Sequence, residues 1–209
     1  MPHEIERRTM NMDGLEVRAA DSVAPKIVGH AALFDSFSSP IANEFVEVIR
    51  PGAFDRAVRE NQDVRALINH DKNFVLGRTA SGTLRLSVDS VGLGIEIDPP
   101  DTSFARDLAV SIGRGDISQM SFAFTVRDQK FTRGGGPGGL DLRELIDVDL
   151  WDVSAVTYPA YSDTAVEMNS QNTAVVGYRD WLSMINAEEN DRAIAIRSRR
   201  QRQLEAGVF

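Results

Sequence analysis

The chain has no cysteine among its 209 residues. This absence excludes disulfide bonds, thiol nucleophiles and zinc sites built on cysteine, and it is compatible with a cytosolic protein. Histidine is also scarce: the three residues are His3, His30 and His70, and no His-x-x-x-His spacing occurs. A metal centre that relies on several imidazoles is therefore not expected.

Long hydrophobic runs are missing as well. No apolar run approaches the roughly 20 residues of a membrane span, and no secretory signal pattern opens the chain. We therefore expect no membrane partner. The net charge of −8 argues against broad nucleic-acid binding by the body of the protein. The hydrophobic share of 42% suits one domain with a real core plus appendages.

Charge is unevenly distributed along the chain. Residues 191–209 carry five arginines against two acidic residues, a net charge of +3 that leaves −11 for the rest. Helical spacing runs through 178–190 and continues through 191–205, after a polar stretch at 170–173 that is typical of a linker. The arginine-rich segment is either a solvated helix face or a detachable tail that binds a partner.

The chain is rich in the period-2 alternation of apolar and polar residues that is typical of half-buried strands. This alternation predicts strands at 26–34, 44–50, 64–70, 75–79, 82–88, 92–97, 117–126 and 145–156. Helical spacing and capping residues predict helices at 53–60 and 103–114. We therefore expect a mainly β fold with a few helices, compatible with a small barrel.

His70 stands out at the end of the predicted strand 64–70. Alternation places it on the same face as Val64, Ala66 and Ile68, so an apolar face ends in an imidazole. Histidine titrates near neutrality and often serves as a general base. The alternative is a histidine that is simply satisfied by its neighbours at a strand end.

Ser121 is equally out of place on the predicted strand 117–126. Met120, Phe122 and Phe124 share one face, whereas Ser121 lies on the other, where the small Ala123 leaves space above it. A serine hydroxyl is a weak nucleophile that needs an adjacent base, and His70 is the best-placed candidate. The alternative is a small residue at a tight strand crossing. Ser118 is a weaker rival, because alternation puts it on the bulky face.

Asp152 is the candidate acid on the predicted strand 145–156. It interrupts the apolar face that includes Val148 and Leu150, while Asp147 and Asp149 fall on the opposite face as ordinary solvated acids. A buried carboxylate needs a partner, and a histidine N–H is a suitable one. Serine, histidine and acid on three strands therefore predict an acyl-transfer site.

Seven motifs carry a resemblance to a known family. They are Gly-His-Ala-Ala-Leu-Phe from residue 29, Ile-Arg-Pro-Gly-Ala-Phe from 49, Leu-Ile-Asn-His-Asp from 67, Leu-Gly-Arg-Thr from 76, Ser-Gly-Thr-Leu from 81, Arg-Gly-Asp-Ile-Ser-Gln-Met-Ser-Phe-Ala-Phe from 114 and Asp-Val-Ser-Ala-Val-Thr-Tyr-Pro-Ala from 152. In this order, from about 29 to 166, they resemble the prohead (capsid maturation) serine proteases of tailed bacteriophages. That family is similar in fold to the herpesvirus assemblins, which are compact β-barrels surrounded by helices.

The resemblance implies roles for the same three residues. His70 matches the family histidine in Asn-His-Asp, and Ser121 matches the serine in Met-Ser-Phe-Gly-Phe. Ala123 departs from that pattern, because glycine is common there. The acid before Val-Ser is usually glutamate, and Asp152 is shorter by one methylene.

By resemblance, the chain is expected to be a serine endopeptidase that cleaves the scaffold domain, the major capsid protein or both, and also itself, during prohead maturation. It would work inside the assembling prohead in the host cytoplasm, without metal or organic cofactor, and could self-associate. Two other classes stay open: a non-catalytic capsid-assembly or scaffolding module, and a metal-dependent hydrolase that uses His70, Asp71 and Asp152.

Three parts are expected along the chain. Residues 1–25 would form a polar N-terminal arm, 26–166 the β-barrel protease domain, and 167–209 a linker with an arginine-rich helical tail. For such a protease, the tail could tether the enzyme to scaffold, capsid protein or nucleic acid in the shell.

Overall fold

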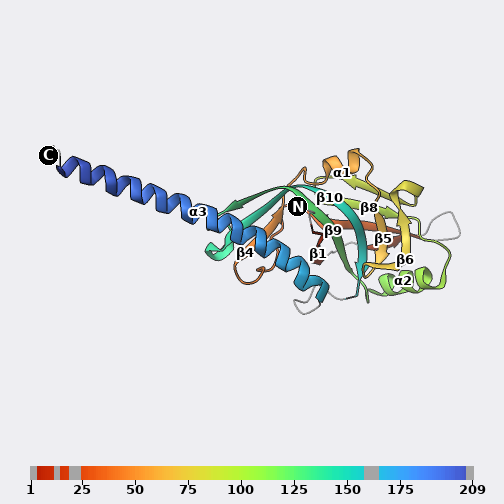
Figure 1. The fold of residues 1–209 in the computed structure, drawn as a ribbon. Coiled ribbons are helices and arrows are strands. Elements are labelled where there is room, and N and C mark those ends of the chain that lie inside the picture. Colours follow the sequence, from red (N-terminus) through yellow and green to blue (C-terminus); the bar gives the residue numbers. More distant parts are fainter. Residues whose placement is uncertain (1–3, 12–14, 19–24, 158–164, 206–209) are drawn as a thin grey trace. The chain divides into compact units, whose positions relative to one another are not determined.

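The computed structural model describes residues 4–11, 15–18, 25–157 and 165–205. The described residues are mostly β-strands with a few helices (Figure 1). The strands are β1 (Glu6–Asn11), β2 (Glu16–Arg18), β3 (Lys26–Leu33), β4 (Phe45–Ile49), β5 (Arg65–Ile68), β6 (Asp71–Arg78), β7 (Leu84–Val88), β8 (Gly92–Ile97), β9 (Gln119–Thr132) and β10 (Asp141–Val156). The helices are α1 (Asp55–Arg59), α2 (Ser103–Arg114) and α3 (Ala165–Glu205), and short 3-10 turns lie at Thr79–Ser81 and Pro137–Gly139.

The strands form two sheets. One has six strands in the order β1-β9-β10-β5-β6, with β4 also paired to β10, and the other has four in the order β2-β3-β8-β7. The long strand β10 is the centre of the larger sheet, because it pairs antiparallel with β9 and parallel with both β4 and β5. Neither set of pairings closes on itself among the described residues, so the predicted closed barrel is not confirmed.

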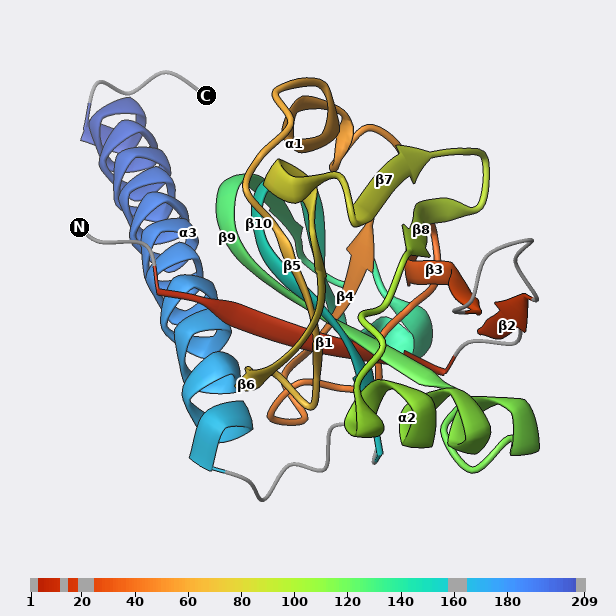
Figure 2. The same cartoon turned by 90° about the vertical axis from the view of Figure 1, so that its right-hand side faces the viewer.

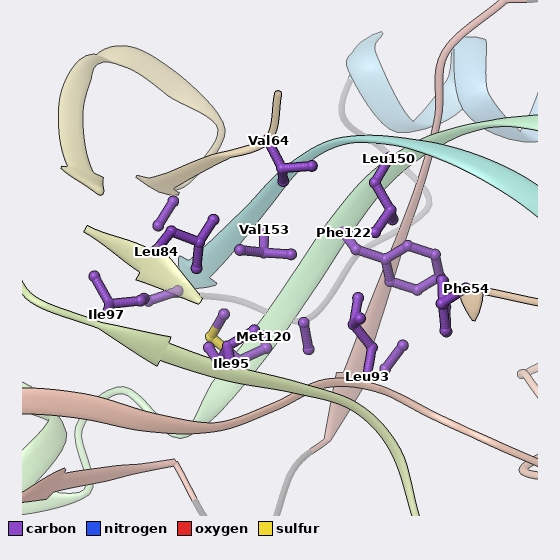
Figure 3. Close-up of a cluster of buried hydrophobic side chains, with 14 of the residues drawn as sticks. Phe54, Val64, Leu84, Leu93, Ile95, Ile97, Met120, Phe122, Leu150 and Val153 are labelled. Atoms are coloured by element: carbon purple, nitrogen blue, oxygen red, sulfur yellow. The ribbon is translucent and has the colours of Figure 1, made fainter. Parts of the chain in front are cut away.

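Side chains from both sheets and from α1 and α2 meet in one hydrophobic core. Figure 3 shows Met120 and Phe122 of β9 among the buried side chains of β8. The Phe122 ring contacts Phe54 edge-on, with centroids 5.6 Å apart, and stacks on Phe124 at 4.9 Å. Because this face of β9 is committed to the core, the opposite face is left for Ser121.

The α2 helix follows the sequence prediction to the residue. Ala105, Leu108 and Ile112 recur at helical spacing and are the buried positions. The helix ends at Gly115, whose φ of 81° is the left-handed conformation that closes many helices and favours glycine. In both views α1 and α2 lie at opposite ends of the strands (Figures 1 and 2), and α2 leads directly into β9.

The segment predicted as a polar arm contributes strands to both sheets. β1 pairs with β9, so that Thr9 is the register partner of Ser121, and β2 pairs with β3. Residue 25 therefore does not mark the edge of the folded unit. The first compact unit runs from Met1 to Thr173, whereas 26–166 was predicted.

A second compact unit runs from Ala174 to Phe209. The stretch 170–173, predicted as a linker, lies inside the continuous helix α3, which also contains the helical segment predicted over 178–205. A polar composition did not break the helix, because the stretch contains neither proline nor glycine. Within the described residues no helix is long and apolar enough to cross a membrane.

Three buried charges and one partly buried arginine fasten β1 to the larger sheet. Arg143 on β10 donates to Glu6 of β1 and to Glu47 of β4, each at 2.8 Å. Arg8 bridges the same two carboxylates, at 2.7 Å from Glu6 and 2.8 Å from Glu47. Burial alone would raise the pKa of the Glu6 carboxyl, but bonds and charges from Arg143 and Arg8 outweigh burial and hold that pKa below its ordinary value.

Replacing Arg143 by methionine should destabilise the protein strongly. The change leaves Glu6 and Glu47 buried with one arginine between them, and breaking a buried pair from one side costs about 3–5 kcal/mol. Urea unfolding at neutral pH measures the loss. Arg106→Met is the control, because its pair with Asp101 is exposed and should matter little.

The same experiment has a pH dependence. Because the folded-state pKa of Glu6 is lowered, its stabilisation is complete above the ordinary carboxyl pKa and is lost as pH falls through the lowered value. The stability gap between wild type and Arg143→Met should therefore narrow in acid. An Arg143→Met protein as stable as wild type at neutral pH would contradict this role of the cluster.

Candidate active site

His70 lies in a tight turn rather than on a strand. β5 ends at Ile68, which pairs with Asp71, the first residue of β6, so that only Asn69 and His70 connect the strands. Their φ angles are 52° and 56°, and positive φ at both central residues is the signature of a type I′ hairpin turn. The predicted strand position of His70 is therefore wrong. The usual glycine of such turns is absent, and asparagine and histidine take its place.

The turn is docked on the end of β10. The Asn69 backbone N–H donates to the Ala155 carbonyl at 2.9 Å. The Asn69 side chain accepts from the Thr157 backbone N–H at 2.9 Å and donates to the Thr157 hydroxyl at 3.1 Å. In Figure 2 the β5–β6 turn lies at the same end of the sheet as the last residues of β10. These bonds hold the backbone of His70 beside β10.

Ser121 lies on the face of β9 that alternation predicts. Met120, Phe122 and Phe124 are buried in the core cluster, and Ser121 is on the opposite face. The residue is only 1% exposed. Its rival Ser118 precedes β9 and is exposed.

Asp152 lies on the same face of the sheet as Ser121, but simple alternation along β10 does not explain this position. The pairing of β10 with β9 shifts between Leu150 and Asp152, so that Trp151 is an extra residue in β10, and it is 47% exposed. Such a bulge inverts the alternation. Leu150 and Val153 both belong to the core, and Asp152 therefore faces away from it. The prediction that Asp152 interrupts the apolar face is wrong.

The structure brings the three predicted residues into one hydrogen-bonded chain. His70 Nε2 lies 2.7 Å from Ser121 Oγ, and His70 Nδ1 lies 2.5 Å from Asp152 Oδ1. An ionised carboxylate only accepts hydrogen bonds, so Nδ1 carries the proton and Nε2 is left to accept from the serine hydroxyl. Asp152 makes this contact directly although it is one methylene shorter than glutamate.

The site is largely shielded from water. The side chains of His70 and Asp152 are 14% and 12% exposed. In such surroundings a hydrogen bond to a charged group is stronger than in water. The arrangement can take a proton from the Ser121 hydroxyl and stabilise the imidazolium that results, which is what nucleophilic acyl transfer requires.

Asp147 and Asp149 lie away from this chain, but Asp149 is not an ordinary solvated acid. It accepts from Arg56 and from Gln62, both at 2.7 Å, and also pairs with Arg127. Burial raises the pKa of the Asp149 carboxyl, but these bonds lower it by more, so the net pKa lies below its ordinary value. Asp147 pairs with Arg56 as well, at 2.9 Å.

The metal-hydrolase alternative needs a cluster of ligands. Among the described residues no group of three or more histidine, aspartate or glutamate side chains could hold a metal ion. Asp71, which that alternative requires, accepts instead from the backbone and the side chain of Asn73, both at 2.9 Å.

Sequence reasoning missed three residues that hold the site together: Asn69, Ser154 and Thr157. Asn69 carried a usable signal, because asparagine is enriched at positive φ and was followed by another polar residue between two strands. Ser154 and Thr157 carried none by themselves. The last residues of their motif, 158–160, lie outside the described residues.

Variants of Asn69 should separate the two tasks of this residue. Asn69→Gly adopts positive φ freely but loses the bonds to Thr157, whereas Asn69→Ala also adds the cost of a left-handed alanine, about 1–2 kcal/mol. Urea unfolding should rank wild type above Gly and Gly above Ala. Proteolytic activity should fall in both variants, since both lose the side-chain bonds that hold the turn to Thr157 at the end of β10. Wild-type activity in both would show that the turn needs no side-chain anchor.

Comparison with known proteins agrees with the motifs of the sequence. The family model described as "Caudovirus prohead serine protease" matches residues 13–177, a range that includes His70, Ser121 and Asp152. Among solved structures, the capsid assembly protease of bacteriophage T4 matches with a TM-score of 0.49 and 12% identity, over 76% of this chain and 100% of that chain. No curated protein matches the sequence. Because the family model spans well over half of the chain, the protein belongs to the caudovirus prohead serine protease family.

Proposed function

We propose that this serine protease uses Ser121 as its nucleophile, His70 as its general base and Asp152 as the acid that orients the imidazole. The observation that carries the proposal is the continuous hydrogen-bonded chain from Ser121 Oγ through both ring nitrogens of His70 to Asp152 Oδ1. Three residues from two strands and a turn meet there, and the order of the hydrogen bonds fits the role proposed for each.

The geometry supports a two-step hydrolysis. His70 Nε2 takes the hydroxyl proton as Ser121 Oγ forms a bond to the peptide carbonyl carbon, and the imidazolium then gives that proton to the leaving amine as the C–N bond breaks. In the second step, His70 Nε2 takes a proton from water as the water oxygen bonds to the acyl carbon. The imidazolium then returns this proton to Ser121 Oγ as the ester C–O bond breaks, which releases the carboxylic acid product. Asp152 keeps its negative charge throughout, fixes the Nδ1–H tautomer and stabilises the imidazolium.

The substrates we propose are proteins of the assembling capsid. Members of this family act in prohead maturation, and we infer that this chain cleaves the scaffold domain, the major capsid protein and itself. The work would take place inside the prohead, in the host cytoplasm. The alternative of a non-catalytic scaffolding module loses support, because a binding module has no use for a base hydrogen-bonded to a buried serine.

Substitutions in the three residues should abolish proteolysis without unfolding the chain. Ser121→Ala and His70→Ala should be about equally inactive, because the two act as one unit and their losses do not add. Asp152→Asn should lose up to about 10⁴-fold in rate, since asparagine favours the wrong tautomer. The intact mass of each protein over time, and of capsid and scaffold proteins incubated with it, measures cleavage.

Two matched variants are the controls. Ser118→Ala and Asp147→Asn remove the same groups outside the hydrogen-bonded chain and should cleave at wild-type rates. Cleavage by Ser121→Ala at the wild-type rate, together with inactivity of Ser118→Ala, would transfer the nucleophile to Ser118 and overturn the proposal.

We further propose that the arginine-rich end of α3 attaches the enzyme to an acidic partner in the prohead. Arg192, Arg197, Arg199 and Arg202 are all exposed in the second unit, in a segment of opposite charge to the rest of the chain. Exposed charges attract such a partner over about 8–10 Å at physiological ionic strength.

Replacing these four arginines by glutamine tests the attachment in the full-length chain. Cleavage of a short peptide should be unchanged, whereas the amount of protease packaged into proheads should fall. For wild type, co-sedimentation with assembling shells should weaken as salt rises. Packaging that is equal for both proteins would show that the arginines are only a solvated face.

A further inference from the structure

One buried hydroxyl next to the catalytic chain has no role in the mechanism above. Ser154 lies on β10 with none of its surface exposed. Its register partners are Ser121 on β9 and Leu67 on β5, so it occupies the middle of the sheet between the nucleophile and the hairpin that carries His70. It follows Asp152 by two residues, a spacing that places both side chains on one face.

The Ser154 hydroxyl contacts both Asp152 and His70, the two residues that must be aligned with each other. It donates to Asp152 Oδ1 at 2.9 Å, because a carboxylate can only accept. Its oxygen accepts from the backbone N–H of His70 at 3.2 Å, because an amide can only donate. The same oxygen lies 3.3 Å from His70 Nδ1, beside the bond from that nitrogen to Asp152.

These contacts make one hydroxyl the link between the main chain of the turn and the carboxylate. His70 is held at its backbone by Ser154 and at its ring by Asp152, and Ser154 holds Asp152 in turn. If the hydroxyl were absent, the turn and the carboxylate could shift independently. A misplacement of about 1 Å in a catalytic group can lower a rate by about 100-fold.

We propose that Ser154 is a positioning residue of this protease, which fixes the His70 imidazole against Asp152 without touching the substrate. The inference rests on the proposed function, because it has meaning only if His70 is the base. A purely structural serine would contribute to stability and leave the chemistry of the folded enzyme unchanged.

The test compares Ser154→Ala with wild type in the full-length chain, using a fluorophosphonate probe that reacts with activated serines. Fold is checked by circular dichroism. The maximal rate constant of modification should fall about 10- to 100-fold, whereas the probe concentration for half-maximal rate should stay the same, because Ser154 positions the base and does not bind the probe. A wild-type rate in Ser154→Ala would overturn the inference.

Thr79→Val is the matched control. The Thr79 hydroxyl is also buried, accepts from the Val64 backbone N–H at 2.9 Å and donates to the Gln62 carbonyl at 2.6 Å, but it has no contact with the catalytic chain. Loss of this hydroxyl should lower the urea midpoint to a similar extent and leave the rate of modification unchanged. An equal fall in rate for both variants would mean that lost stability, and not lost positioning, explains the effect.

Proton NMR gives a measurement that a loss of stability alone would not change, namely the chemical shift of the His70 Nδ1 proton. The short bond from His70 Nδ1 to Asp152 should place the Nδ1 proton far downfield, and this resonance should shift or broaden in Ser154→Ala but not in Thr79→Val. If Ser154→Ala does not fold, hydrogen exchange of wild type still decides: free exchange of the His70 amide would contradict its bond to Ser154. A wild-type chain that does not react with the probe at all would instead overturn the proposed function.

Discussion

The docking of the β5–β6 turn on the end of β10 is the constraint on which the candidate site depends. β5 runs parallel to β10 over Asp152 to Ala155, so the hairpin turn beyond Ile68 lies beside the end of β10, and the His70 ring extends from there to the Asp152 carboxylate. Both turn residues have positive φ, and a left-handed conformation outside glycine persists only where the surroundings enforce it. Bonds from Asn69 to Ala155 and Thr157 provide that enforcement. The position of the imidazole is therefore set by bonds between the turn and the end of β10, and not by the pairing of β5 alone.

The position of β10 in turn depends on charges buried elsewhere in the sheet. Arg143 lies on the same strand as Asp152, at the end where β10 pairs with β4, and binds Glu6 and Glu47. This cluster also secures β1, which covers the side of β9 next to Ser121. Each buried charge has a partner of opposite sign, as burial requires. Ser121 and Asp152 therefore lie on the adjacent strands β9 and β10, and the charge cluster holds both strands that flank β9, namely β1 and β10.

The sequence predicted which three residues meet better than it predicted how the chain brings them together. Alternation placed Ser121 on the free face of β9, because that strand is regular from Met120 to Phe124. It failed for Asp152, because a bulge at Trp151 inverts the pattern and only the pairing with β9 reveals it. It failed for His70 because a two-residue turn without glycine looks like the continuation of a strand. The pairing of β1 with β9 joins residues more than a hundred positions apart, a contact that no local pattern contains.

The most direct test of the central claim is to identify the residue that a fluorophosphonate modifies in the folded, full-length protein. Peptide mapping by mass spectrometry after reaction should place a single adduct on the peptide that contains Ser121, and on Ser121 itself by fragmentation. The adduct should be absent after unfolding in urea and in the His70→Ala variant, because an isolated serine hydroxyl is too weak a nucleophile. An adduct on Ser118 or another serine, or labelling of Ser121 that is undiminished without His70, would contradict the account.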